Sequence, residues 1–432
     1  MLVDDLYSKL VNEEDARVCR EIPEAACVEV PRNFFLLIGS YVLTKLGDAI
    51  ANPKTTLTWM MDAIGAPVSL TGLLVPVRES GSLIPQLVIA AFVRRRPVRK
   101  WVWATGSLIQ AGAVLAMGLT AWFFKGVLAG VLVVALLALF SLARGLSSVA
   151  AKDVLGKTIP KTRRGRVNGF SASLAGLATL GVGSALVAFG ADDSAGGTFL
   201  LLLVGAAVLW FAASALYSRI IERPGETEGG GNALAEAFHK LVLLRDDAPF
   251  RNFVIARALL LCSALSAPYY VILARQHSHG TTGQLGFFII AGGLASSLSA
   301  PFWGRLADWS SRTVMVLAAC ITSGLGFLAV SLEHFSPRHA GAIWLYPLIF
   351  FVLMVAHSGV RLGRKTYVVD LALGNRRTDY VAVSNSVIGV ALLLLGSMGA
   401  VAQAFSVPLV ILVLSAFGLG GAFMSWRLPE VT

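Results

Sequence analysis

Long runs of apolar residues alternate with short polar segments along the whole chain. A helix needs about 20 consecutive apolar residues to cross the hydrocarbon core of a bilayer, and by this criterion the sequence predicts twelve transmembrane helices. They are expected at residues 34–52, 66–93, 101–121, 126–150, 167–189, 197–219, 252–274, 283–303, 313–332, 343–366, 380–402 and 406–426. The predicted fold class is therefore an all-α membrane protein, with the lipid bilayer as its surroundings.

The loops between the predicted spans differ in charge according to their position. Loops that follow even-numbered spans are basic, for example residues 94–100, 152–166 and 361–377, whereas the opposite loops hold isolated cations such as Lys54 and Lys125. Lys and Arg are enriched in the cytoplasmic loops of membrane proteins. We therefore expect both termini to lie in the cytoplasm.

The overall composition agrees with this topology. The chain is 56% hydrophobic and 14% charged, whereas soluble domains carry about 25% charged residues. The net charge of +11 is concentrated in the loops of one side, so topology explains it and nucleic acid is not expected as a partner. The four cysteines are scattered rather than clustered as in an exported disulfide framework, and we expect them to be free thiols.

The sequence carries no recognisable motif for catalysis or for a cofactor. The stretch AKDVLGKT (151–158) fits a relaxed phosphate-binding loop, but a working loop follows a strand and opens a helix, whereas this one follows an apolar span. The patterns His-Glu-x-x-His and Gly-x-Ser-x-Gly are absent from the sequence. We therefore expect a protein that is not an enzyme and that holds no cofactor or metal.

A polar segment in the middle of the chain divides the spans into two groups of six. It comprises residues 220–251, contains the flexible stretch ERPGETEGGG (222–231), and continues into a predicted amphipathic helix with Leu234 and Phe238 on one face. The expected organisation is a cytoplasmic N-terminal segment, a first six-helix bundle, a cytoplasmic linker and a second six-helix bundle, at residues 1–33, 34–219, 220–251 and 252–427.

The stretch GRLADWSSR (304–312) resembles the loop signature of the major facilitator superfamily, which that family places between spans 8 and 9. IPKTRRGRVNGF (159–170) is similar to the family's turn into span 5. The resemblance implies two pseudo-symmetric six-helix halves and a monomeric secondary transporter of the bacterial inner membrane. It also implies that Gly304 packs closely, that Asp308 closes the cytoplasmic gate and that Arg312 is its basic partner.

Charged residues inside the predicted spans are the strongest functional signal, because a charge at the centre of a membrane helix costs about 3 kcal/mol. At a rise of about 1.5 Å per residue, Lys45 and Asp48 of span 1 and Arg78 and Glu79 of span 2 lie at similar depths. We expect Asp48 to meet Arg78 and Lys45 to meet Glu79. The four charges either lock the two spans together or line a central cavity.

Three further polar residues are candidates for the same cavity: Gln86, Arg144 and His357, the last being the histidine deepest within a span. In the functional interpretation, Asp48 or Glu79 takes up a proton when substrate occupies its cationic partner. The expected activity is proton-coupled transport of a small organic, anionic solute that Arg78 anchors. Two alternatives are polyspecific efflux of amphipathic compounds by proton antiport, and a non-transporting lipid-handling or assembly factor on the same scaffold.

Overall fold

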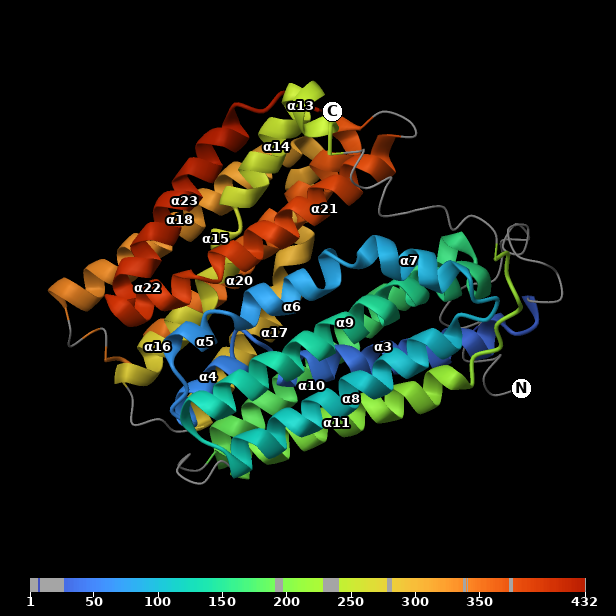
Figure 1. The fold of residues 1–432 in the computed structure, drawn as a ribbon, viewed down its shortest axis with the longest axis horizontal. Coiled ribbons are helices and arrows are strands. Elements are labelled where there is room, and N and C mark those ends of the chain that lie inside the picture. The colour runs from blue at the N-terminus through green and yellow to red at the C-terminus, as the bar shows by residue number, and fades with distance from the viewer. Residues whose placement is uncertain are drawn as a thin grey trace.

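The computed structural model describes residues 7, 27–190, 197–227, 241–277, 282–336, 339, 341–372 and 376–431, and the regular elements within them are helices. The first half of the chain forms α3 (Val30–Ile50), α4 (Thr56–Ala63), α5 (Val68–Thr71), α6 (Leu74–Leu83), α7 (Gln86–Arg94), α8 (Lys100–Phe123), α9 (Gly126–Thr158), α10 (Lys161–Phe189) and α11 (Gly197–Ser218). In Figure 1 these helices, coloured blue to green, make up one bundle.

The second half of the chain forms a second bundle, coloured yellow to red in Figure 1. Its helices are α13 (Leu243–Asp246), α14 (Ala248–Leu259), α15 (Cys262–Leu265), α16 (Ala267–His277), α17 (Thr282–Trp309), α18 (Ser311–Phe335), α20 (Leu345–Leu371), α21 (Arg376–Leu395), α22 (Met398–Ala404) and α23 (Val407–Trp426).

The described helices include ten that are long and apolar enough to cross a membrane, and the bent pair Val68–Leu83 and Val88–Arg94 makes an eleventh. The remaining predicted span, 34–52, corresponds to α3, which packs against α10 and α11 inside the first bundle. Lys45 and Asp48 make this helix less apolar than the others. The chain is thus a multi-pass, all-α membrane protein, as the hydropathy pattern predicts.

Two sequence-based expectations fall on parts of the chain that are described incompletely. The predicted amphipathic helix begins in residues 228–240, which lie outside the described residues, and the N-terminal segment is described only at Tyr7 and from Cys27 onward. Cys262 and Cys320 are free thiols, as expected. Cys27 is disulfide-bonded, so the expectation of free thiols is wrong for this residue.

Several spans are interrupted near their middle. Span 1 stops at the end of α3 and resumes with α4, because Pro53 lacks the amide hydrogen that a continuous helix needs. Span 2 breaks at Pro85, where its two parts bend by 44°. Span 7 divides into α14, α15 and α16, with Pro268 in the first turn of α16. Such breaks bring backbone groups and polar side chains into the interior of the membrane domain.

The two bundles touch at the end opposite the basic loops, which we call the closed end. Here α5 packs on α22 and α4 packs on α16. A Cβ atom on Gly72 would lie 2.5 Å from the Cα of Gly399, so the two backbones are in direct contact. Arg275 Nε lies 2.8 Å from Asp62 Oδ2 and ties α16 to α4. The closed end is therefore sealed by backbone contact and by an ion pair.

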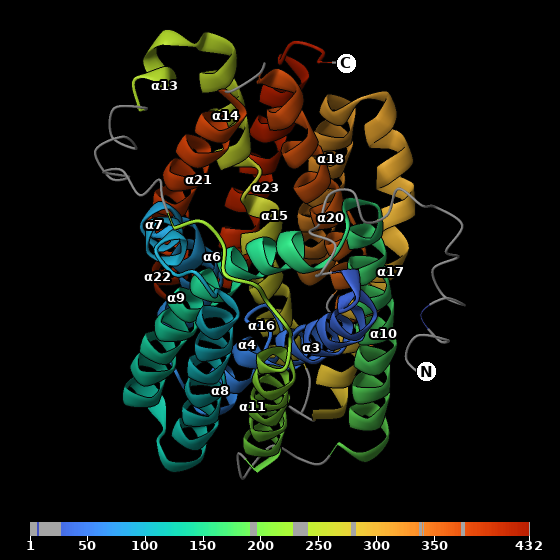
Figure 2. The same cartoon turned by 90° about the vertical axis from the view of Figure 1, so that its right-hand side faces the viewer.

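Toward the basic loops, which we call the basic end, the two bundles diverge (Figures 1 and 2). A cavity of about 950 Å³ lies there between α7 and α9 of the first bundle and α21 of the second. Along the sides, α10 runs beside α17 and α6 beside α21. The structure therefore represents a conformation that is closed at one end and open at the basic end.

Candidate functional site

Asp48, Arg78 and Arg144 form one ionic group that joins three spans of the first bundle. Arg78 Nη2 lies 3.0 Å from Asp48 Oδ1, as the depth argument expects, and Arg144 Nη1 of α9 lies 2.5 Å from Asp48 Oδ2. The guanidinium of Arg78 also stacks over Phe140, 4.8 Å from the ring centroid. A single carboxylate thus neutralises two arginines only in part.

Lys45 and Glu79 do not form the expected pair. The Lys45 ammonium donates to Ser171 Oγ at 3.2 Å and to the carbonyl of Asn168 at 3.4 Å, both on α10. The rise per residue predicts the depth of a side chain but not its direction around the helix axis, and Lys45 points toward α10. Among the described residues, Glu79 makes no ion pair, although Lys54 and Arg361 act on it electrostatically.

Lys54 is a candidate site residue that the sequence interpretation assigned to a loop. It lies in the break between α3 and α4, is 9% exposed, and its Nζ is 3.0 Å from His357 Nε2 on α20. His357 Nδ1 is 3.0 Å from Ser263 Oγ of α15. Because an ammonium can only donate, Nε2 accepts, Nδ1 donates to Ser263, and the imidazole is neutral. Pro53 beside Lys54 was the available signal for a break inside the span.

Two arginines of α20 extend this polar region. Arg361 and Arg364 follow His357 by one and two helical turns, and both act electrostatically on Glu79 and Lys54. Arg361 is exposed and Arg364 is half-buried, and the Nε atom of Arg364 is enclosed without a hydrogen-bond partner. We call the following residues the central cluster: Lys45, Asp48, Lys54, Arg78, Glu79, Arg144, Arg361 and Arg364.

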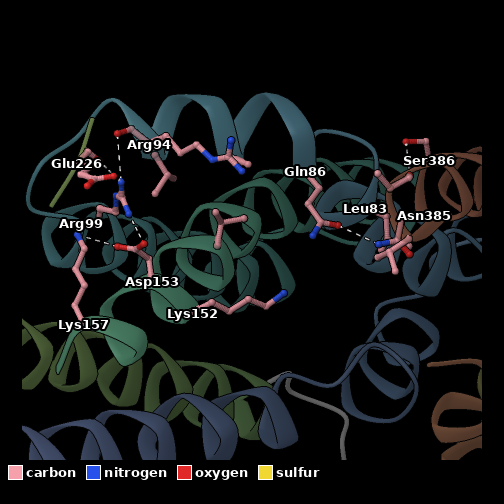
Figure 3. Close-up of a pocket in the computed structure, with 15 residues that line it drawn as sticks. Leu83, Gln86, Arg94, Arg99, Lys152, Asp153, Lys157, Glu226, Asn385 and Ser386 are labelled. Atoms are coloured by element: carbon pink, nitrogen blue, oxygen red, sulfur yellow. Dashed lines mark hydrogen bonds and ion pairs between the residues drawn. The ribbon is translucent and has the colours of Figure 1, made fainter. Parts of the chain in front are cut away.

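The cavity at the basic end lies between the two bundles. It is lined by Gln86 and Lys152 of the first bundle and by Asn385 and Ser386 of the second, and Figure 3 shows their side chains around it. Asn385 donates to Gln86 Oε1 at 3.3 Å. This contact is a polar bridge between the two bundles at the wall of the cavity.

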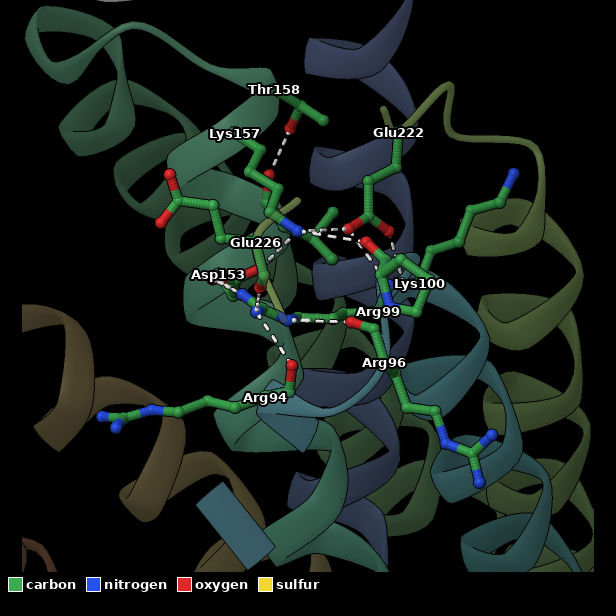
Figure 4. A network of polar contacts seen from close by, with 11 residues as sticks. Arg94, Arg96, Arg99, Lys100, Asp153, Lys157, Thr158, Glu222 and Glu226 are labelled. Carbon is green, nitrogen blue, oxygen red and sulfur yellow. Dashed lines mark hydrogen bonds and ion pairs between the residues drawn. The ribbon is translucent and has the colours of Figure 1, made fainter. Parts of the chain in front are cut away.

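A second polar network lies beside the cavity and holds the start of the linker (Figure 4). The buried carboxylate of Glu222 accepts from the backbone amides of Arg99 and Lys100, at 3.0 and 2.6 Å, at the first turn of α8. Lys157 Nζ lies 3.1 Å from the same carboxylate and 2.9 Å from Asp153. A carboxylate at a helix N-terminus satisfies free amides and opposes the helix dipole.

The residues of the loop signature are separate from this site. A Cβ atom on Gly304 would meet nothing within 4 Å, so the close packing implied by the resemblance is not present. Asp308 is exposed and has no ion-pair partner within the described part of the chain. Arg312 pairs with Glu430 at 2.6 Å and donates to the carbonyl of Leu428.

Comparison with known proteins places this chain in a family. The family model described as "Major Facilitator Superfamily" matches residues 37–396. No curated protein sequence matches the chain significantly.

Several solved structures share the fold. A structure entitled D-xylose-proton symporter has a TM-score of 0.70 at 14% identity and covers 92% of this chain and 98% of its own. A mutant of the nucleoside transporter NupG has a TM-score of 0.69 at 12% identity, covering 91% and 99%. The inward-open xylose transporter XylE from E. coli has a TM-score of 0.65 at 13% identity, covering 92% and 96%. At these identities the likeness concerns the fold.

Proposed function

Because the chain belongs to the major facilitator superfamily, whose fold supports secondary transport, we propose that it moves a small organic anion across the bacterial inner membrane by proton-coupled alternating access. In this proposal the basic end is cytoplasmic, in accordance with the charge of its loops. The chain acts as a monomer, and the described conformation is open toward the cytoplasm.

The charge of the central cluster carries this proposal. It contains six cations and two carboxylates, and it lies in membrane-spanning segments where unpaired charges are costly. Asp48 is already shared between two arginines. Arg361 is exposed and makes no ion pair among the described residues. A solute that carries negative charge would complete the neutralisation, whereas a neutral or cationic solute would not.

Glu79 is the better of the two candidate coupling residues. Asp48 is held by direct ion pairs from Arg78 and Arg144, which engage both of its carboxylate oxygens. Glu79 has cations nearby but no direct ion pair within the described part of the chain. When an anionic substrate occupies those cations, Glu79 loses their stabilisation and can take up a proton. Substrate and proton would then cross the membrane together.

The loop signature has a role in the opposite conformation. We propose that Asp308 pairs with a neighbouring helix when the basic end closes, and that its exposed state here belongs to the open conformation. Gln86 and Asn385, already in contact across the two bundles, would guide this closure from inside the cavity.

Transport assays in proteoliposomes test the proposal directly. The purified chain would be reconstituted with a pH dye inside, and lactate, succinate, glycerol phosphate and D-xylose would be added at constant ionic strength. Saturable acidification should follow addition of at least one anion, and D-xylose should give none. Glu79→Gln should retain substrate flux driven by a substrate gradient while losing the proton signal.

Asp370→Asn is the matched control, because this carboxylate is exposed near the end of α20. It should leave both signals unchanged. Proton movement that persists in Glu79→Gln would exclude Glu79 as the coupling residue. Acidification by amphipathic cations but by no anion would instead support polyspecific efflux.

A further inference from the structure

We infer that Lys54, Arg361 and Arg364 together form the binding site of an organic dianion, either a phosphate monoester or a dicarboxylate. The inference deepens the proposed anion transport and rests on it. It assigns substrate binding to the break in span 1 and to α20, rather than to Arg78.

The contacts of Lys54 leave its charge available to a ligand. Its ammonium is enclosed between the two bundles, and its hydrogen bond goes to His357 Nε2 at 3.0 Å. That imidazole is neutral because its Nε2 accepts from the ammonium, while its Nδ1 donates to Ser263, whose hydroxyl in turn donates to the carbonyl of Leu260. The chain of donors therefore orients Lys54 without neutralising it.

The spacing on α20 presents both arginines on the side of Lys54. His357, Arg361 and Arg364 are separated by four and three residues, so they lie along one helix face. Both arginines interact electrostatically with Lys54 and with Glu79. The Nε atom of Arg364 is buried without a hydrogen-bond partner, and buried polar atoms are nearly always paired. This atom is a donor that a ligand oxygen could satisfy.

The balance of charges around Glu79 indicates how many negative charges the ligand carries. Four cations act electrostatically on Glu79, namely Lys54, Arg78, Arg361 and Arg364. Arg78 is paired with Asp48, so the carboxylate of Glu79 leaves two positive charges without compensation among Lys54, Arg361 and Arg364. Arg78 and Arg144 do not neutralise these two charges, because both are cations, and the carboxylate of Asp48 is already shared between them. Guanidinium groups bind phosphate and carboxylate oxygens through paired N–H donors, and an ammonium adds a point charge. A dianion matches this set of groups, whereas a monoanion leaves one charge unpaired.

The site also joins the two bundles. Lys54 belongs to the first bundle, and Arg361 and Arg364 belong to the second. A dianion between them would replace repulsion among like charges by attraction across the interface. Binding would therefore favour the movement that brings the bundles together, which is the step that alternating access requires.

Binding measurements on the full chain in nanodiscs test the inference. Ligand-dependent thermal stabilisation would be titrated with succinate, glycerol phosphate, lactate and D-xylose at constant ionic strength. We expect succinate or glycerol phosphate to bind at least about tenfold more tightly than lactate, and Arg361→Gln to abolish that preference. Arg245→Gln, a substitution of an exposed arginine next to α14, is the matched control and should behave as the parent.

The outcomes separate the two proposals. Tight binding and transport of lactate without preference for either dianion would overturn the dianion site and leave anion transport standing. Absence of saturable binding and of transport for all three anions would overturn both. A preference for a dianion that survives Arg361→Gln would show that the dianion binds elsewhere.

A second measurement does not depend on the choice of probe. If the three cations repel one another in the empty site, Arg361→Gln should raise the melting temperature of the ligand-free chain or leave it unchanged. Arg245→Gln should have no effect. A marked decrease for Arg361→Gln alone would mean that Arg361 is a structural ion-pair partner, and the inference would be wrong.

Discussion

Asp48 accepts hydrogen bonds from two arginines that come from different helices. Loss of this one carboxylate would leave two guanidinium groups facing each other in a largely enclosed site. The cost of breaking a buried ion pair by removing one partner is about 3–5 kcal/mol. It should be smaller here, because the Asp48 and Arg144 side chains are 21% and 33% exposed.

We predict that Asp48→Asn lowers the free energy of unfolding by about 1–3 kcal/mol. The double variant Asp48→Asn/Arg144→Gln should recover part of this loss, because it removes one of the two repelling charges. Thermal unfolding of the purified chain in detergent would measure both, with Asp370→Asn as the neutral control. Equal destabilisation of the single and double variants would show that the repulsion is not the cause.

At the scale of single residues, the sequence predicts how deep a side chain lies in the membrane but not the direction in which it points around the helix axis. Counting the rise per residue placed Asp48 and Arg78 in one layer, and the two side chains are in contact. The same count also paired Lys45 with Glu79, although Lys45 reaches Ser171 instead. The rotation of each helix depends on its packing partners, which one sequence does not contain.

At the scale of the element, the breaks in spans 1 and 7 have a common effect. Each occupies the first position of its six-helix half, and each brings a polar side chain, Lys54 or Ser263, to the same histidine. Hydropathy alone treats span 1 as ending near Pro53. The helix instead resumes as α4 and continues to the closed end, so a residue assigned to a loop is in fact central.

The contact between α5 and α22 leads to a second prediction. Because a Cβ atom on Gly72 would meet the backbone of Gly399 at 2.5 Å, Gly72→Ala should force the two helices apart at the closed end. Spin labels on Lys125→Cys and Phe405→Cys, in a variant with Cys320 replaced by Ser, should show an added population at longer distance.

Gly112→Ala serves as the comparison, since a Cβ atom at this helical glycine meets nothing within 4 Å. It should leave the distance distribution unchanged. An unchanged distribution for Gly72→Ala would mean that the helices absorb the methyl group locally, and that this glycine pair does not control the closed end.

For the whole molecule, the sequence predicts the fold better than the conformation. The apolar runs and the loop signature point to the superfamily fold, and the family match agrees. The state of the two ends depends on a free-energy difference between two arrangements of the same helices. Neither the cavity beside Gln86 nor the exposed state of Asp308 follows from local sequence.

The asymmetry between the ends leads to a third prediction, which tests the orientation in the membrane. A cysteine in place of Ser386, which lines the cavity, should react with a membrane-impermeant maleimide in inside-out vesicles but not in intact cells. Lys125→Cys, at the opposite end, should show the reverse pattern. Both variants would be made with Cys320 replaced by Ser. The opposite result for the pair would place the basic end outside the cytoplasm.

The network around Glu222 also determines where a separately expressed first bundle should end. Hydropathy ends the first bundle at residue 219, yet Asn33 binds the backbone of Ile221 in both directions, and Gly225 donates to the carbonyl of Pro97. The first residues after α11 are thus a strap that belongs to the first bundle. A separately expressed half that ended at 219 would lose the Glu222 carboxylate that caps the start of α8. A half that ended at 227 would keep this carboxylate and its hydrogen bonds.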